Sequence, residues 1–357
     1  MSGPHDVVRH AYEDQKEIME KHGAEVIYFD DKTIFLNDGA DKWNWSYLNW
    51  FYHLAAEALL GGITSLAVTY DHLETIPDNK IARLLIPWEG NWRDNYGINE
   101  AMIKGIFNND VIEKDLWSEL SDSNRWIGFE KVVIVDRYAS HRHNTISNVW
   151  NKMSLPIFEE LSKPPPPFFS PYRESLLSNL DLLSILKPTR YHLGKPLKSI
   201  PKIVYLDRQE STRKLSVEDN QGLLDVFENL TKHGKAIYEN PHLPELSFKQ
   251  QVEVVKDADI IIGIHGNGLT HQLWMPEGGI VIELFVPKAF LRDYQVLSQA
   301  LGHRHITIWD DRELPPNEWE LIKGQLNPTI MHNGTLIPLQ TEFIRTLLED
   351  LVGEMSS

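Results

Sequence analysis

Two arginines in the second half of the chain have the chemistry and the spacing to hold a diphosphate. Arg208 and Arg213 flank a turn that follows a β-branched segment at Lys202–Leu206, which predicts a strand. Guanidinium groups stay charged and bind phosphate oxygens through paired hydrogen bonds. Ligands of alternating strand–helix folds bind at the carboxyl ends of strands, so this position indicates a diphosphate clamp. The alternative is two surface arginines in salt bridges.

A glycine-rich turn in the same half could receive the phosphates. His265-Gly-Asn-Gly268 connects a predicted strand at Asp259–Ile264 to a helix expected to begin near Leu269. Glycines let a phosphate approach the backbone, and a helix N-terminus offers N–H groups and a positive dipole end. The spacing is not G-x-G-x-x-G, so an NAD site is not expected. The alternative is a plain glycine turn.

A carboxylate lies within the next predicted strand, Gly279–Phe285. Glu283 is surrounded there by apolar residues, where an unpaired carboxylate would be costly. Near a strand end it could accept hydrogen bonds from a ribose, or it could be paired within the fold. The candidate donor-binding residues are therefore Arg208, Arg213, His265, Gly266, Asn267, Gly268, Leu269 and Glu283.

The first half of the chain offers a candidate for acid–base chemistry. His53 and Glu57 are four residues apart in a segment predicted to be a helix over 47–61, so they share one helix face. A His–carboxylate pair can act as a base with its orienting partner. The alternative is a buried histidine whose hydrogen bond is satisfied by its neighbour.

Motifs for a metal ion are poor. Asp257-Ala-Asp259 precedes its strand, whereas a metal–diphosphate Asp-x-Asp should follow one. Asp30-Asp31 and Asp310-Asp311 follow predicted strands but lack that spacing, and His141-Arg-His143 fits no standard zinc spacing. The chain has no cysteine, which excludes thiolate ligands and nucleophiles. We therefore expect no required metal or cofactor.

The order of the predicted elements indicates two α/β domains. After the proline run at Lys163–Pro171, apolar strands alternate with helices, which is typical of a parallel, doubly wound sheet. Before the run, strands are predicted at 25–29, 82–87 and 131–136, with a second helix at 98–107. We expect an N-terminal domain over 1–163, a linker over 164–171, a Rossmann-like domain over 172–338 and a final helix within 339–357.

Charge and hydropathy exclude several partners. The formal net charge is −16, and a field of that sign repels phosphate backbones, so nucleic acid is not expected to bind. The sequence contains no run of about 18 apolar residues, so no membrane-spanning helix is predicted. Residues 1–22 are polar and charged, which is not the pattern of a signal peptide.

Taken together, these motifs resemble glycosyltransferase family 61, which includes the EGF-domain O-GlcNAc transferase and plant xylosyl- and arabinosyltransferases. The amino-acid sequence of the glycine-rich segment most resembles that of fungal members. The matching motifs are Asn49–Glu57, Asp207-Arg-Gln209 with Arg213, and Gly263-Ile-His-Gly-Asn-Gly-Leu-Thr270 followed by Pro276 and Ile282-Glu283.

The resemblance implies a GT-B-like fold, in which two Rossmann-like domains face each other across a cleft. It also implies an inverting transfer from a nucleotide-sugar, usually a UDP-sugar such as UDP-xylose or UDP-GlcNAc, to a glycan or glycoprotein hydroxyl. The resemblance further implies a location in the lumen of the Golgi or endoplasmic reticulum, with the protein held there by an N-terminal membrane anchor. No such anchor is predicted in this sequence, so two alternatives are open: a cytoplasmic location, or a chain that is a fragment without its anchor.

Within that chemistry, Arg208, Arg213 and the N–H groups of Gly266–Leu269 are expected to stabilise the departing diphosphate. Glu57, oriented by His53, is the candidate base, with His265, His271, Asp136 and His143 as rivals. Two other functions remain open: a nucleotide-binding hydrolase or epimerase on the same fold, and a non-catalytic module. In the module, the 11 Trp and 12 Tyr would line a glycan-binding groove.

Overall fold

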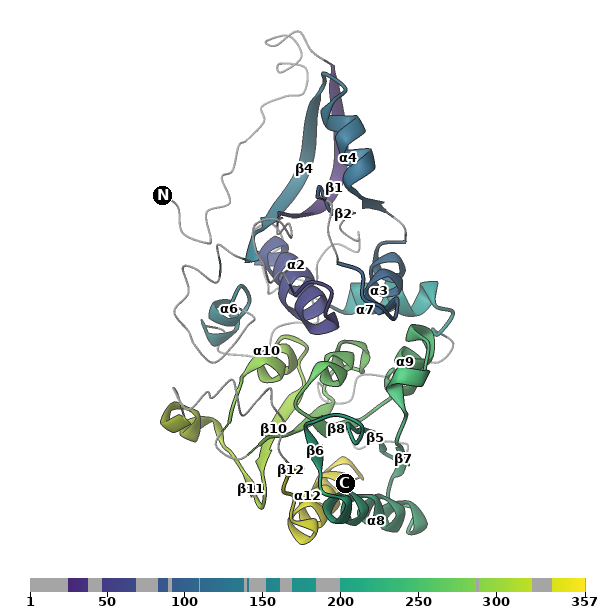
Figure 1. The fold of residues 1–357 in the computed structure, drawn as a ribbon, viewed down its shortest axis with the longest axis vertical. Helices are drawn as coiled ribbons and strands as arrows, with labels where there is room; N and C mark the ends of the chain where they lie inside the picture. Colours follow the sequence, from purple (N-terminus) through teal and green to yellow (C-terminus); the bar gives the residue numbers. More distant parts are fainter. Residues whose placement is uncertain are drawn as a thin grey trace. The chain divides into compact units, whose positions relative to one another are not determined.

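A computed structural model describes most of the chain, and the described residues form two compact units (Figure 1). Residues up to Leu183 belong to the first unit and those from Ile200 onward to the second. The described ranges are 25–37, 47–68, 83–88, 92–108, 110–137, 140, 152–160, 169–183, 200–286, 289–322 and 336–356.

The first unit contains a parallel sheet in the order β3-β2-β1-β4. Its strands are β1 (Val26–Leu36), β2 (Arg83–Leu85), β3 (Val111–Ile112) and β4 (Trp126–Val135). Its described helices are a π-helix η2 (His53–Leu59), α2 (Leu60–Leu66), α3 (Ile98–Phe107), α4 (Lys114–Ser121), α6 (Leu155–Glu160) and α7 (Ser170–Asn179). The apolar residues of η2 and α2 are buried, so this continuous helical segment supplies much of the core of the unit.

Three expectations for the first unit differ from the structure. The helix expected over 47–61 begins at Phe51, becomes the π-helix η2 at His53 and continues as α2 to Leu66. Asp30-Asp31 does not follow a strand, because β1 runs on through a bulge at which Asp31 has φ 70°. The strand predicted at 131–136 starts earlier, since β4 pairs with β1 along nearly its full length.

The segment after the proline run packs within the first unit. Most of the run lies outside the described residues, but α7 begins at Ser170 near its end, with Pro171 in the first turn, where a missing N–H costs nothing. Ser175 and Asn179 on α7 hydrogen-bond the carbonyls of Ile106 and Gly105 at distances of 2.9 and 2.6 Å. Helix α7, whose residues 172–179 were assigned from the sequence to the C-terminal domain, thus packs against α3.

The second unit contains a sheet in the order β11-β10-β9-β8-β5-β7, parallel except for β11. Its strands are β5 (Lys202–Leu206), β6 (Lys214–Leu215), β7 (Ile237–Glu239), β8 (Ile260–Ile264), β9 (Ile280–Leu284), β10 (Arg304–Trp309), β11 (Arg312–Glu313) and β12 (Leu336–Ile337), with β6 paired to β12. Its helices are α8 (Val217–Lys232), η4 (Leu243–Glu245), α9 (Phe248–Val255), η5 (Asn267–Trp274), α10 (Asp293–Ala300), η6 (Pro316–Ile322) and α12 (Thr341–Ser356).

The core of the second unit explains the strand assignments made from sequence. Strands β5, β8 and β9 are buried at every residue, as expected for parallel strands covered on both faces. The final helix α12 packs on α8 and buries Ile344, Leu348 and Leu351 in the same hydrophobic cluster. Both units are therefore mixed α/β with parallel sheets, as predicted from the sequence.

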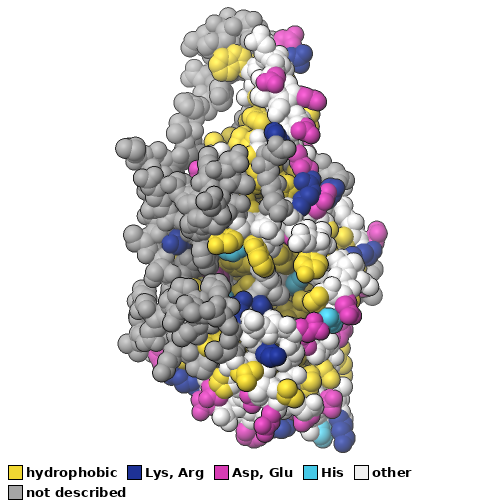
Figure 2. Space-filling model, viewed as in Figure 1, with side chains coloured by type: hydrophobic (Ala, Val, Ile, Leu, Met, Phe, Trp, Pro, Cys, Tyr) yellow, Lys and Arg dark blue, Asp and Glu magenta, His cyan; other side chains and the backbone are white. Residues whose placement is uncertain are grey.

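Acidic and basic side chains are interspersed over the described surface that Figure 2 draws. Among the described helices, none has both the length and the apolar character that a membrane crossing requires.

Candidate functional site

The strand order of the sheet in the second unit reverses between β5 and β8. Numbered along the chain from β5, its five parallel strands lie in the spatial order 2-1-3-4-5. The direction of winding reverses between the first and third of these strands, β5 and β8. Ligands of doubly wound sheets bind at the carboxyl ends of the strands beside such a reversal. Arg208 follows β5 by two residues and His265 follows β8 directly, so both lie at this edge.

Arg208 and Arg213 are close together and partly buried. Arg208 donates from Nε to Ser211 Oγ at 3.3 Å and from one terminal nitrogen to the His265 carbonyl at 3.4 Å. Burial, and then the charge of Arg213, lower the pKa of Arg208 to about 10. Burial also lowers the pKa of Arg213. Within the described part of the chain, neither guanidinium forms an ion pair with a carboxylate, so the site holds two like charges that favour an anion.

Gly266 is the residue that makes this arrangement possible. Its backbone has φ 154° and ψ 177°, a region that is essentially restricted to glycine. A Cβ at this position would lie 1.5 Å from a terminal nitrogen of Arg208. From the sequence, this glycine was expected to let a phosphate approach the backbone. In the structure, the Arg208 guanidinium lies across the turn against the α-carbon of Gly266.

The helix expected after the turn is a 3₁₀ helix, η5, beginning at Asn267. The tighter winding has a consequence for the predicted N–H donors, because the N–H of Leu269 donates to the Gly266 carbonyl at 3.0 Å. The expectation that Leu269 offers a free N–H is therefore wrong. The backbone donors that lead into the helix are those of Asn267 and Gly268.

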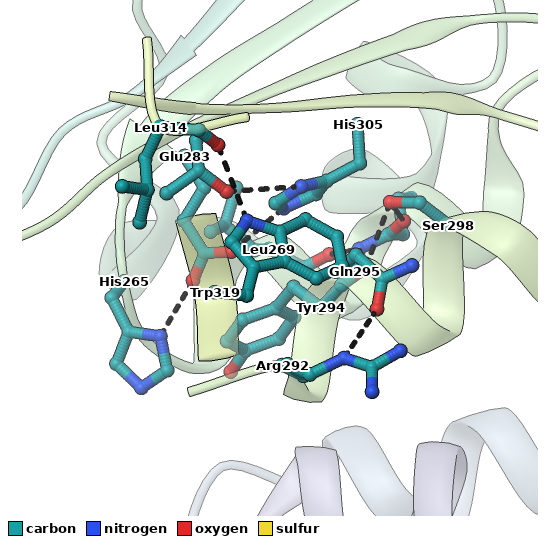
Figure 3. Close-up of polar contacts among 12 residues, drawn as sticks. His265, Leu269, Glu283, Arg292, Tyr294, Gln295, Ser298, His305, Leu314 and Trp319 are labelled. Atoms are coloured by element: carbon teal, nitrogen blue, oxygen red, sulfur yellow. Dashed lines mark hydrogen bonds and ion pairs between the residues drawn. The ribbon is translucent and has the colours of Figure 1, made fainter. Parts of the chain in front are cut away.

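Glu283 is buried between two histidines (Figure 3). Its Oε1 lies 2.5 Å from His265 Nδ1, and its Oε2 lies 2.8 Å from His305 Nε2. The carboxyl group has no exposed surface. This is the paired carboxylate that the sequence left open as the alternative to a ribose ligand.

The electrostatic surroundings of Glu283 favour its protonated form. Burial, and then the nearby Asp293 carboxylate, raise the pKa of Glu283 well above its usual range, while Arg213 opposes this rise. Burial lowers the pKa of His305 to about 3, so this histidine is neutral. His305 and Asp293 were not identified from the sequence, because nothing in its local pattern separates a buried partner from a surface residue.

In the first unit, His53 and Glu57 do lie on one helix face, within the π-helix η2. His53 Nδ1 is 2.9 Å from Glu57 Oε2, and Arg137 donates to the same oxygen at 2.8 Å. The Glu57 side chain is fully buried, whereas that of His53 is 17% exposed. The ring of His53 stacks on Tyr47 with a centroid separation of 5.3 Å. His53 is therefore the member of the pair that can meet a ligand.

Arg137 was missed in the sequence, although a signal for it was present. It follows β4 by two residues, within Val135-Asp-Arg137, just as Arg208 follows β5 within Leu206-Asp-Arg208. Reading each strand end for an arginine would have found both. Among the rival bases, burial lowers the pKa of His271 to about 3, and its side chain is buried. His141 and His143 lie outside the described residues.

The fold of the second unit defines a class: a doubly wound α/β domain with two partly buried arginines beside the point where the strand order reverses. The sequence model of glycosyltransferase family 61 matches residues 51–282, which is more than half of the chain. The chain therefore belongs to glycosyltransferase family 61.

Relatives of known activity match shorter parts of the chain. It is 30% identical over 123 residues to an EGF domain-specific O-linked N-acetylglucosamine transferase of Drosophila melanogaster, covering 34% of this chain and 22% of the relative. It is 46% identical over 68 residues to the protein of that name in Gallus gallus, covering 19% of this chain and 12% of the relative. The matched segment is thus less than a quarter of the length of either relative.

Proposed function

We propose that this protein is an inverting glycosyltransferase that moves a sugar from a UDP-sugar to a hydroxyl group of a glycan or glycoprotein. The observation that carries the proposal is the pair of partly buried guanidinium groups, Arg208 and Arg213, at the switch-point edge. Like charges in a partly buried site destabilise each other until an anion enters, and a diphosphate supplies that anion. Family membership supports a sugar as the group attached to it.

Inversion follows from a single in-line displacement at the anomeric carbon. The acceptor oxygen forms a bond to this carbon as the bond to the diphosphate oxygen breaks, and a base takes the hydroxyl proton. Arg208, Arg213 and the N–H groups of Asn267 and Gly268 stabilise the negative charge that develops on the diphosphate. The names of the relatives favour an N-acetylglucosaminyl donor, with UDP-xylose as the second candidate.

The base in this proposal comes from the first unit. Glu57 was the base expected from the sequence, but a carboxylate without exposed surface cannot approach a hydroxyl group closely. We therefore assign proton acceptance to Nε2 of His53. Glu57 accepts the Nδ1–H hydrogen bond and is charge-balanced by Arg137. For the compartment, we propose the Golgi or endoplasmic reticulum lumen, the location that the family resemblance implies.

Replacing either Arg208 or Arg213 by alanine should weaken UDP binding. Each substitution removes a charged hydrogen-bond donor, which is worth about 1.5–3 kcal/mol. The dissociation constant, measured by calorimetry, should therefore rise about 10- to 100-fold. The melting temperature of the unliganded protein should stay constant or rise, because one of two repelling charges is removed.

Arg304→Ala is the matched control for this pair. Arg304 begins β10 at the opposite end of the sheet, and its exposed side chain pairs with Glu354 at 3.1 Å. It should leave UDP affinity unchanged. Normal UDP affinity in both Arg208→Ala and Arg213→Ala would remove the diphosphate clamp from the proposal.

Transfer should not require a divalent metal ion. In this site two guanidinium groups and backbone N–H donors carry out the charge neutralisation that a metal ion supplies in other enzymes. Turnover of UDP-N-acetylglucosamine, followed by release of UDP, should survive excess EDTA. Loss of turnover that manganese or magnesium restores would show that the acidic pairs of the sequence do bind a metal.

A further inference from the structure

The hydrogen bonds around Glu283 carry an inference about how the donor is held, and it rests on the proposed function. His265 stands at the end of β8, directly before Gly266, and its carbonyl accepts a hydrogen bond from Arg208. The Nδ1 atom of its ring is held by Glu283. The other ring nitrogen, Nε2, points away from Glu283 (Figure 3). Nδ1 is thus held by a contact in the protein interior, whereas Nε2 is directed away from that contact, at the carboxyl end of β8.

The proton count of the His265–Glu283 pair decides what Nε2 can do. With one extra proton, the pair is either an imidazolium beside a carboxylate or a neutral imidazole that accepts a hydrogen bond at Nδ1 from the carboxyl group. In both arrangements Nε2 bears a hydrogen and can donate to a phosphate. If that proton is lost, Nδ1–H donates to the carboxylate and Nε2 presents a lone pair. A lone pair repels a phosphate oxygen.

We propose that His265 and Glu283 share one proton that keeps Nε2 of His265 a hydrogen-bond donor to the nucleotide diphosphate. Glu283 then acts through His265 as a positioning residue and does not touch the ribose. His305 holds the second carboxyl oxygen from β10, with its Nδ1 3.4 Å from the Thr307 hydroxyl group. This fixes the carboxyl plane and leaves Oε1 for His265.

The charges around the pair favour retention of this proton. The raised pKa of Glu283 means that the proton is kept to higher pH than by an ordinary carboxyl group. A bound diphosphate adds negative charge at the same edge and strengthens this effect. Among the described residues, the titratable and charged groups that face Glu283 are His265 after β8, His305 on β10, Asp293 and Tyr294 on α10, and Arg213 in the loop after β5.

The sign of the pH dependence follows from this arrangement. At low pH the pair holds its proton and UDP binds with the Nε2–H contact. As pH rises, the pair loses its proton first in the free protein and only at higher pH in the UDP complex. Between these two pH values UDP binding must take up a proton, so UDP affinity falls by up to about tenfold per pH unit across this window. Above it the contact is lost and affinity levels off.

Glu283→Gln separates this inference from a structural role. In the tautomer of His305 that carries its hydrogen on Nε2, this nitrogen selects the amide oxygen of the glutamine, and the amide NH₂ is left to donate to His265 Nδ1. The neutral His265 ring then accepts at Nδ1 and carries its hydrogen on Nε2. The variant should bind UDP with affinity close to the low-pH wild type, and the fall in affinity with rising pH should be absent.

The experiment is calorimetric titration with UDP from pH 5.5 to 8.5, in two buffers of different ionisation enthalpy. The protons taken up by UDP itself cancel between wild type and Glu283→Gln. The wild type should take up one more proton per UDP than the variant within the sensitive window. His233→Gln is the control, because His233 is exposed at the end of α8. This variant should show the same dependence of UDP affinity on pH as the wild type.

Identical profiles for wild type and Glu283→Gln would overturn the shared proton while leaving the donor site in place. If no UDP binds to the wild type at any pH, both this inference and the proposed function fail. If the variant does not fold, the wild-type proton count decides alone, after subtraction of the protons measured by titrating free UDP. Zero uptake then overturns the proposal.

Discussion

Gly266→Ala is expected to lower UDP affinity by about 100-fold or more. Alanine adopts the φ of 154° only with strain, and its Cβ would lie 1.5 Å from Arg208. The turn and the guanidinium must both move, so two contacts to the diphosphate are lost. Two losses of about 1.5 kcal/mol each correspond to about 100-fold in the dissociation constant. Calorimetry with UDP measures it directly.

Gly302→Ala separates the loss of this contact from strain alone. Gly302 has φ 70°, and a Cβ there would meet nothing within 4 Å. Alanine at this position should lower the melting temperature through backbone strain and leave UDP affinity unchanged. If Gly266→Ala binds UDP as tightly as Gly302→Ala does, the contact between Arg208 and the turn is not part of the donor site.

The sequence predicted the second unit better than the first because its signals are local. Strands β5 and β8 are short, fully apolar runs that end in turns, and α8 is bounded by a serine N-cap and by Gly234. Such patterns determine strand and helix boundaries within a few residues of sequence. In the first unit, β1 continues through a bulge at two aspartates, where the local pattern predicts an end.

The partners of the site residues could not be predicted, because they are set by tertiary structure. Glu57 receives its hydrogen bond from Arg137, 80 residues further along the chain. Glu283 is bonded by His305, which reaches it from the neighbouring strand β10. Sequence indicated that Glu283 needs a partner, and only the register of β9 with β10 identifies this one. The same holds for the Arg208 contact with the carbonyl before Gly266.

Removing the imidazole of His53 is expected to have the largest effect on turnover. In the proposed mechanism His53 takes the hydroxyl proton, and loss of a general base typically costs about 100- to 10,000-fold in rate. His53→Ala should show that loss while UDP affinity stays near normal, since the donor residues lie in the other unit. Glu57→Gln should also slow turnover, because the carboxylate stabilises the imidazolium that forms.

The double variant decides which of the two residues is the base. If Glu57 acts only through His53, then His53→Ala and the double variant are equally slow, because an orienting carboxylate has nothing left to orient. If Glu57 is itself the base, as the sequence suggested, the double variant is slower than His53→Ala. Thr64→Val perturbs the same helical segment by removing a buried hydroxyl bonded to the Leu60 carbonyl, and it should change the melting temperature but not the rate. If His53→Ala and Glu57→Gln likewise lower only the melting temperature, the pair stabilises the helix and the base lies elsewhere.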